Sequence, residues 1–381
     1  MGTVDPPAPV IKRAHMSADW LAAIVLAGPA APASAALFCV STSAQLQSAL
    51  DIARINGEND VIRVRAGSYE VTGSGFVYES TAMENHDIEI SGGWRPYILG
   101  PCAVQDATPW TTVLDGNGDT RILSLRIEGS SADARLSRLT FLAGYVGGFN
   151  AGALEIHSVG ESGGVVVESS AFIANESSMG GGLLIDVRGP KVSVVNNVFV
   201  ANRALSNMPA ASIVNFGGTD NAVVFTNNSI IGNELGNSPV ADAAAVYLAS
   251  PNVIAANNNF WDNDGHDLDT GGSGVRSIFN NNYQSLRPRG GEYLLDNISV
   301  QPAYQEGLLN FTPVRSSPLV DAGTEPRGID PGWYLTAVDL NGAPRKVGPH
   351  VDIGAFENDT IFADGFEASG PFSSDDRRRA E

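Results

Sequence analysis

The feature that most constrains this chain is an internal repeat in its middle part. A short motif with one central apolar residue recurs five times, at steps of 31, 27, 31 and 30 residues. The central residues are Phe141, Phe172, Phe199, Ile230 and Phe260. A nearly constant period in this range is typical of a solenoid, in which each repeat stacks on the one before it.

Each repeat holds two further apolar runs, and neither shows a helical period. One run precedes the motif, and the other follows it beyond a turn rich in Gly, Ala and Asn. The preceding runs lie at 165–167, 192–195, 222–225 and 253–255, and the following runs at 154–156, 183–185, 213–214 and 246–248. Short apolar runs between turns indicate β-strands. The sequence therefore predicts an all-β chain folded as a parallel β-helix, rather than a leucine-rich or helical repeat.

Asparagine recurs at two positions of the repeat. The first set is Asn175, Asn202, Asn233 and Asn263, and the second is Asn197, Asn228 and Asn258. Equivalent residues of stacked coils lie about 4.8 Å apart, so each amide can bond the next one along the stack. We predict two asparagine ladders with a structural role; a simple preference of Asn for turns is the alternative. The central phenylalanines are predicted to stack in the core, with Ile230 in the same layer.

The two ends of a solenoid expose strand edges that need a cover. Thr42 or Ser43 can cap a helix that runs to Ala53 and stops at Asn56-Gly57. We therefore expect a short N-terminal helix cap, followed by strands that begin at 61–64 and continue at 76–78, 88–90, 113–114 and 122–127.

The first 35 residues have the pattern of an export signal. Lys12 and Arg13 precede an apolar run at 21–26, and the small residues Ala33-Ser34-Ala35 resemble a cleavage site. That run is shorter than the roughly 20 residues that span a bilayer, and a buried helix is the alternative. We predict a signal peptide at 1–35, a single β-helix domain at 36–357 and a polar, flexible tail at 358–381.

The chain contains two cysteines, Cys39 and Cys102. In an exported protein, two cysteines with no competing thiol are expected to form a disulfide. Two buried free thiols are the alternative.

The overall charge narrows the range of partners. The chain has 42 acidic and 23 basic residues, which gives a formal net charge of −19. Such a surface repels the phosphate backbone, so we expect no nucleic-acid partner. The 43% of hydrophobic residues argues against disorder. After the signal region no stretch is long and apolar enough for a transmembrane helix, and we expect a monomer.

Three motifs near the C-terminus carry a resemblance to a known family. They are Ser-Pro-Leu-Val-Asp-Ala-Gly at 317–323, Asp-Leu-Asn-Gly-Ala-Pro-Arg at 339–345 and Val-Asp-Ile-Gly-Ala-Phe-Glu at 351–357. Their order and spacing resemble the closing region of choice-of-anchor Q proteins, which are bacterial proteins of the pectin-lyase-like superfamily. The resemblance covers 39–357 and implies a right-handed parallel β-helix. It also implies an exported protein, located in the periplasm, on the outer surface or outside the cell.

The same superfamily includes polysaccharide lyases and hydrolases, so an enzyme has to be considered. The polygalacturonase-type signature contains Gly-His-Gly and Arg-x-Lys, whereas this chain has Gly265-His266-Asp267 and no Arg-x-Lys. This argues against that class of hydrolase. Lyases are more divergent and are excluded less firmly.

The runs that follow the motifs predict a row of outward side chains. The alignment takes Leu154, Leu183, Ile213 and Val246 as inward residues. The first outward row is then Glu155, Leu184, Val214 and Tyr247, and the second is His157, Asp186, Phe216 and Ala249, with Arg188 further along. His157 and Asp186 are expected side by side on neighbouring coils.

Three interpretations of this face stay open. His157 and Asp186 are the candidate catalytic acid–base pair. In the second interpretation a sugar chain binds along the face, with Tyr247 as an aromatic platform. The residues of that candidate binding site are Glu155, His157, Asp186, Arg188 and Tyr247. The third interpretation is an ordinary solvated surface with a cross-strand ion pair.

A turn near the end of the repeats is rich in carboxylates. Asp262, Asp264, Asp267 and Asp269 lie within eight residues, and Ca²⁺ takes oxygen ligands. Calcium is the one cofactor that the residues suggest. The turn lacks the closing Glu of an EF-hand, and a purely acidic turn is the alternative.

Together these patterns predict an exported cell-surface or secreted β-helix, acting as a non-catalytic binding or adhesion scaffold for a glycan or a surface partner. The alternative is a polysaccharide lyase or glycoside hydrolase acting on an acidic polysaccharide.

Overall fold

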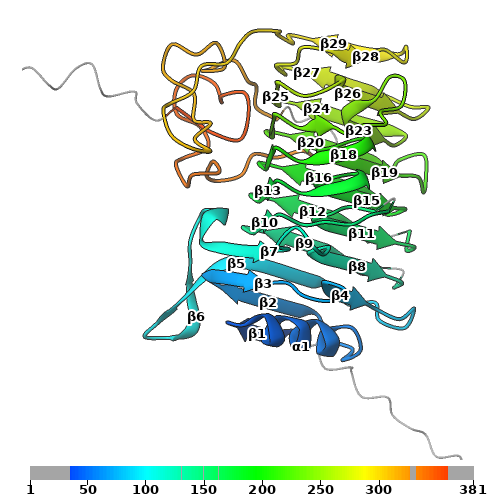
Figure 1. The fold of residues 1–381 in the computed structure, drawn as a ribbon, viewed down its shortest axis with the longest axis vertical. Helices are drawn as coiled ribbons and strands as arrows, with labels where there is room; N and C mark the ends of the chain where they lie inside the picture. Colours follow the sequence, from blue (N-terminus) through cyan, green and yellow to red (C-terminus); the bar gives the residue numbers. More distant parts are fainter. Residues whose placement is uncertain (1–34, 130, 149, 162, 327–331, 359–381) are drawn as a thin grey trace, which may run out of the picture. The chain divides into compact units, whose positions relative to one another are not determined.

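The computed structural model describes residues 35–129, 131–148, 150–161, 163–326 and 332–358. The predicted signal peptide, apart from Ala35, lies outside these residues, and so does the predicted tail, apart from Asn358. The described part is mostly β-structure, and its strands are arranged in long parallel sheets that rise through the molecule (Figure 1).

Three sheets recur in the same order along the chain. Each complete coil passes through one strand of sheet A, then sheet B, then sheet C, and the next coil pairs with it in parallel. This arrangement is consistent with a parallel β-solenoid.

Sheet A contains the runs that precede the repeated motif. Its strands are β1 (Ala36–Val40), β2 (Asp60–Arg65), β5 (Ile88–Tyr97), β9 (Ala134–Ser137), β12 (Val165–Glu168), β16 (Lys191–Val195), β20 (Ala222–Thr226), β24 (Asn252–Ala256), β27 (Arg276–Phe279) and β29 (Glu292–Leu295). A further strand, β6 (Gly100–Gln105), forms an antiparallel hairpin with β5.

Sheet B contains the motifs themselves. Its strands are β3 (Gly67–Glu70), β7 (Thr112–Asp115), β10 (Thr140–Leu142), β13 (Ala171–Ile173), β17 (Val198–Val200), β21 (Ser229–Ile231) and β25 (Asn259–Trp261). A single 3-10 turn, η1 (Pro109–Thr111), comes just before β7.

Sheet C contains the runs that follow the motifs. Its strands are β4 (Phe76–Glu79), β8 (Leu123–Ile127), β11 (Leu154–Ser158), β15 (Leu183–Val187), β19 (Ala211–Asn215), β23 (Ala244–Ala249), β26 (His266–Gly271) and β28 (Leu286–Arg287). A short sheet D joins β14 (Glu176–Met179), β18 (Arg203–Asn207) and β22 (Glu234–Leu235) between sheets B and C.

The central residues of the repeat pair in register and are fully buried. The rings of Phe141, Phe172 and Phe199 stack with centroids 4.9 and 4.7 Å apart. Ile230 interrupts this column. There Phe225 of sheet A supplies the missing ring, 6.3 Å from both Phe199 and Phe260. The aromatic core is therefore continuous because a second sheet contributes to it.

Both sets of asparagines form side-chain ladders. In the first, Asn175, Asn202 and Asn233 each donate an amide bond to the next member, at 2.8, 3.0 and 2.9 Å. In the second, Asn197 donates to Asn228 at 3.1 Å, and the bonds continue to Asn258. The structure extends this second ladder to two residues beyond the repeat that we aligned, Asn281 and Asn297.

In the three aligned coils, the residue directly before the asparagine of the second ladder is also an asparagine. Asn196, Asn227 and Asn257 adopt the left-handed conformation, with φ of 59°, 56° and 56°. Asn tolerates this conformation better than most side chains. The first Asn of each pair therefore makes the sharp turn from sheet A to sheet B, and the second forms the ladder.

The N-terminal end of the stack is covered by α1 (Ser43–Ala53). Thr42 is its N-cap, and the Thr42 side chain accepts a bond from the Gln45 N–H. The buried face of the helix packs on the core and consists of Leu46, Ala49, Leu50 and Ala53. Beside this end a disulfide joins Cys39 of β1 to Cys102 of β6, as predicted. No helix among the described residues is long and apolar enough to cross a membrane.

The last part of the chain, 300–326 and 332–358, is called the closing segment below. It runs beside the stack rather than in it, and Figure 1 shows it in orange and red. Leu340, Ala355 and Phe356 pack on the outer face of sheet B, against Ala171 and Val198. Trp333 packs in a second cluster with Val224 and Ile254 of sheet A. The closing segment thus covers parts of two sheets.

Candidate functional site

The outward face of sheet C carries the predicted binding residues. On β11, Glu155 and His157 lie between Ser124 and Arg126 of β8 on one side and Leu184 and Asp186 of β15 on the other. His157 and Asp186 are register partners, so they occupy neighbouring positions on adjacent coils.

The predicted alignment of β19 is wrong by two residues. Leu183 pairs with Ala211, whereas Ile213 pairs with Ile185. The outward residues of β19 are therefore Ser212 and Val214, in place of Val214 and Phe216. A shift of two residues preserves the alternation of inward and outward side chains. Because Ala211 is small, the hydrophobic pattern alone selects Ile213 as the first inward residue.

His157 is held by its neighbour on the same strand. Its Nε2 lies 2.6 Å from Oε1 of Glu155, and Arg121 Nη1 lies 2.5 Å from Oε2 of the same carboxylate. Glu155 is buried, while Asp186 is exposed. The ring of His157 is thus oriented by Glu155 rather than by Asp186. The buried Glu155 carboxylate thus contacts His157 of its own strand and forms an ion pair with Arg121, which precedes β8.

A second charged group lies further along the same face, beside Tyr247. Asp269 is the register partner of Tyr247 and is buried. It accepts bonds from Arg287 at 3.0 Å and from Arg289 at 2.8 and 2.7 Å. The hydrogen bond to the Asp269 carboxylate raises the pKa of Arg289. Tyr247 is half-buried beside this cluster, and the exposed Arg188 lies on the turn after β15.

The structure does not assemble the predicted calcium site. Asp267 accepts bonds from Asn263 and from the backbone N–H groups of Gln284 and Ser285. Asp269 is bound by two arginines, as described above. Asp264 accepts a bond from the Leu235 N–H. Three of the four predicted ligands, all but Asp262, therefore bond to separate partners, and within the described residues no group of three or more His, Cys, Asp or Glu is placed to hold a metal ion.

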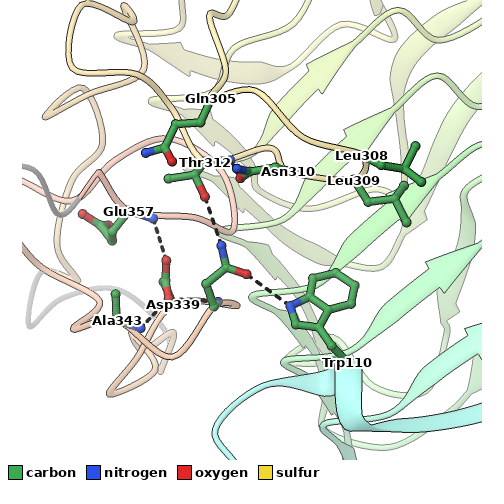
Figure 2. Close-up of a pocket in the computed structure, with 10 residues that line it drawn as sticks. Trp110, Gln305, Leu308, Leu309, Asn310, Thr312, Asp339, Ala343 and Glu357 are labelled. Carbon is green, nitrogen blue, oxygen red and sulfur yellow. Dashed lines mark hydrogen bonds between the residues drawn. The ribbon is translucent and has the colours of Figure 1, made fainter.

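A pocket that the sequence did not reveal lies where the closing segment meets sheet B. Its volume is about 480 Å³. Trp110 of η1 forms one wall, and Figure 2 shows the opposite side built from the closing segment. The lining residues are Trp110, Gln305, Leu308, Leu309, Asn310, Thr312, Asp339, Asn341, Ala343 and Glu357.

A chain of hydrogen bonds fixes the polar wall of this pocket (Figure 2). Trp110 Nε1 donates to Oδ1 of Asn341 at 3.1 Å, and Asn341 Nδ2 donates to Oγ1 of Thr312 at 3.0 Å. Asp339 in turn accepts bonds from the backbone N–H groups of Asn341 and Ala343, at 2.9 and 2.8 Å. The Asp-Leu-Asn-Gly-Ala motif is therefore a tight turn that presents the Asn341 side chain to Trp110.

Beside the pocket, buried polar groups connect two of the closing motifs to each other. Arg345 donates through Nη2 to the carbonyl oxygens of Asp352 and Gly354, and lies 3.3 Å from Glu357. Burial raises the pKa of Glu357 to about 8 and that of Asp352 to about 6. Asp339 also accepts a bond from the Glu357 N–H. The motifs thus determine how the closing segment folds, and so shape the pocket.

The pocket combines three regions that are far apart in the chain. Trp110, the loop at 305–312 and the turn at 339–343 meet only because Phe356 and Leu340 pack on sheet B. The closing motifs were the one available signal, and they did not point to Trp110.

Comparison with family models and with curated proteins identifies no relative of this chain. No family model matches the chain, and a search of curated proteins finds no match. The choice-of-anchor Q resemblance therefore rests on the sequence motifs alone.

Proposed function

We propose that this chain is an exported, non-catalytic glycan-binding protein, with a right-handed parallel β-helix of the choice-of-anchor Q type. Three features support this proposal. The stacked parallel sheets are those of a solenoid. The disulfide suits an oxidising compartment such as the periplasm or the cell exterior. The closing motifs occur in the order and spacing that the group has.

The observation that carries the binding function is the pocket at Trp110. Its volume lies within the roughly 300–1,000 Å³ of small-ligand sites. It combines an indole ring with the amides of Gln305, Asn310 and Asn341. A sugar ring has an apolar face that packs on an aromatic ring, and hydroxyl groups that bond to amides as both donor and acceptor. Such a lining suits a small saccharide.

The charges of the pocket favour a neutral sugar. Of the described residues that line it, none is Lys, Arg or His. A uronate would find no cation to neutralise its carboxylate, and the net charge of −19 repels it further. We therefore propose a neutral oligosaccharide as the ligand.

The outward face of sheet C is retained as a second surface of the same proposal. Tyr247 is its aromatic residue, and the polar residues are Glu155, His157, Asp186 and Arg188. The face is open and follows the stack, so it suits an extended chain rather than a single sugar unit. His157 and Asp186 are also the residues on which a lyase or hydrolase would depend.

The test is a binding titration of the purified chain against neutral and acidic oligosaccharides, followed by tryptophan fluorescence and calorimetry. Trp110→Ala is expected to weaken binding of a neutral ligand by about tenfold or more, because large aromatic residues dominate such sites. Trp110→Phe keeps an aromatic face and is expected to retain part of the affinity. Tyr247→Ala is the corresponding test of the sheet C surface.

Two outcomes would contradict this assignment. Loss of binding in Tyr247→Ala with full binding in Trp110→Ala would move the site to sheet C. Release of reducing ends or of unsaturated products from a polysaccharide, lost in His157→Ala or Asp186→Ala, would show that the chain is an enzyme.

A further inference from the structure

The hairpin formed by β5 and β6 ends in bulky apolar side chains. Tyr97, Ile98 and Leu99 follow one another at its tip and are 63%, 87% and 89% exposed. Turns of this kind usually carry Gly, Asn, Asp or Ser. The stretch 96–101 has no charged residue at all. Figure 1 shows the hairpin, in cyan, projecting from the side of the stack.

The base of this hairpin is firmly held. The disulfide ties Cys102 to β1, and the Arg63 guanidinium lies 4.0 Å from the centre of the Trp94 ring. Arg63 also donates to the carbonyl oxygen of Cys102 at 3.0 Å, and Arg95 forms an ion pair with Asp106. An exposed apolar tip on a firmly held base is typical of an interaction site rather than of a loose loop.

We propose that the tip residues Tyr97, Ile98 and Leu99 insert into the surface layer of a neutral phospholipid bilayer, so that the chain docks on a membrane. The area of the tip distinguishes a bilayer from a protein partner. Three side chains at roughly 150 Å² each offer on the order of 450 Å². A stable protein interface takes about 800 Å² from each partner. A bilayer sets no such minimum, because apolar side chains enter it individually.

The chemistry of the tip also fits the membrane surface. Tyr is enriched at the headgroup level of membranes, where its ring is apolar and its hydroxyl stays hydrated. Ile98 and Leu99 lie beyond it at the turn and would reach the acyl chains. The pairing of Tyr97 with Gly100 closes the hairpin directly below them, so few backbone groups would enter the apolar layer.

The charge of the whole chain selects the lipid. A net charge of −19 repels an anionic leaflet, and the cation nearest to the tip in sequence, Arg95, is already paired with Asp106. The proposal is therefore limited to zwitterionic lipid. It is independent of the glycan-binding function, since the pocket at Trp110 is not part of the hairpin tip.

The experiment is flotation of the purified chain with phosphatidylcholine vesicles. The unchanged chain is expected to float with the vesicles. Ile98→Ser/Leu99→Ser is expected to bind at least about tenfold more weakly, because both apolar contacts are lost. Met83→Ser is the matched control, since Met83 is 91% exposed and lies outside the hairpin. It is expected to bind like the unchanged chain. The altered side chains are exposed, and equal melting temperatures would verify the fold.

Failure of the unchanged chain to bind phosphatidylcholine would overturn the proposal, and so would equal binding of the double variant. Stronger binding to vesicles that contain phosphatidylglycerol would overturn the choice of neutral lipid. If sedimentation shows a dimer that Ile98→Ser/Leu99→Ser converts to a monomer, the tip binds a second copy of the chain and the membrane proposal is wrong.

Discussion

Each side chain in the asparagine ladders can form several hydrogen bonds at once. Oδ1 of Asn228 accepts bonds from the backbone N–H and the side-chain amide of Asn197, at 2.9 and 3.1 Å. The Asn228 side-chain amide donates to the backbone oxygen of Val194 and to Oδ1 of Asn258. All of these groups are buried, and a buried polar group without a partner costs about 1–3 kcal/mol. Each ladder residue is therefore important to stability, although its chemistry suggests an ordinary turn residue.

We expect Asn228→Ala to lower the free energy of unfolding by about 3 kcal/mol, because it leaves the buried backbone N–H of Asn197 unpaired and removes the bonds to Val194 and Asn258. Asn237→Ala is the control, since Asn237 is exposed and its removal is expected to change stability by less than about 0.5 kcal/mol. Urea unfolding of both variants measures the difference. Equal stability of the two would show that the ladder bonds contribute little.

The buried carboxylate of Glu357 makes stability depend on pH. Burial raises its pKa from 4.5 to about 8, so the folded chain keeps a proton that the unfolded chain releases. This contribution to stability is complete below pH 4.5 and is lost as the pH rises through about 8. Burial of Asp352, whose pKa rises to about 6, acts in the same direction.

We therefore expect the urea midpoint to fall between pH 4.5 and 8, and expect Glu357→Gln to flatten the upper part of that decline. The variant keeps Asp352 and also the buried Asp60, whose pKa rises to about 6. Part of the decline below pH 7 should thus remain. A Glu357→Gln profile parallel to that of the unchanged chain would contradict the assigned cause.

At the scale of elements, the disulfide connects the first strand to the hairpin. Cys39 and Cys102 are 63 residues apart, and the loop that they close contains α1 and the first full coil. A cross-link over a loop of this length removes much conformational freedom from the unfolded chain. It also holds β6 against β1, and so maintains the base of the apolar tip.

We expect Cys39→Ser/Cys102→Ser to lower the free energy of unfolding by about 2–4 kcal/mol. Adding a reductant to the unchanged chain should produce the same loss, and should leave the double variant unaffected. Calorimetric scans with and without reductant measure both effects. A reductant effect on the double variant would show that the loss has another cause.

The strands also show which features the sequence repeat predicts and which it does not. The repeat located strands of all three sheets in the middle of the chain, because a central apolar residue recurs in all five repeats and a following Asn in four of them. It placed β19 two residues too far along, because a strand has the same alternation before and after such a shift. It could not show that Phe225 completes the phenylalanine column, since that ring comes from a different sheet.

At the scale of the whole molecule, the faces of the stack differ in what covers them. The closing segment packs on sheets A and B, through Trp333 on the first and Phe356 on the second. The outward face of sheet C keeps its charged networks around Glu155 and Asp269. The proposed sugar pocket therefore lies on a covered side of the stack, whereas the extended candidate surface lies on sheet C.

The sequence by itself determined the stacked all-β architecture, the helix cap, the two ladders and the pair of cysteines that form the disulfide. These features come from local patterns that each coil repeats, so neighbouring residues contain the necessary information. Only the tertiary structure decided which groups meet at the candidate sites. Trp110 meets Asn341 across 231 positions, His157 contacts Glu155 rather than Asp186, and three of the four aspartates at 262–269 bond to separate partners. Such contacts depend on how the closing segment packs and how each side chain finds its hydrogen bonds, and no periodic pattern encodes them.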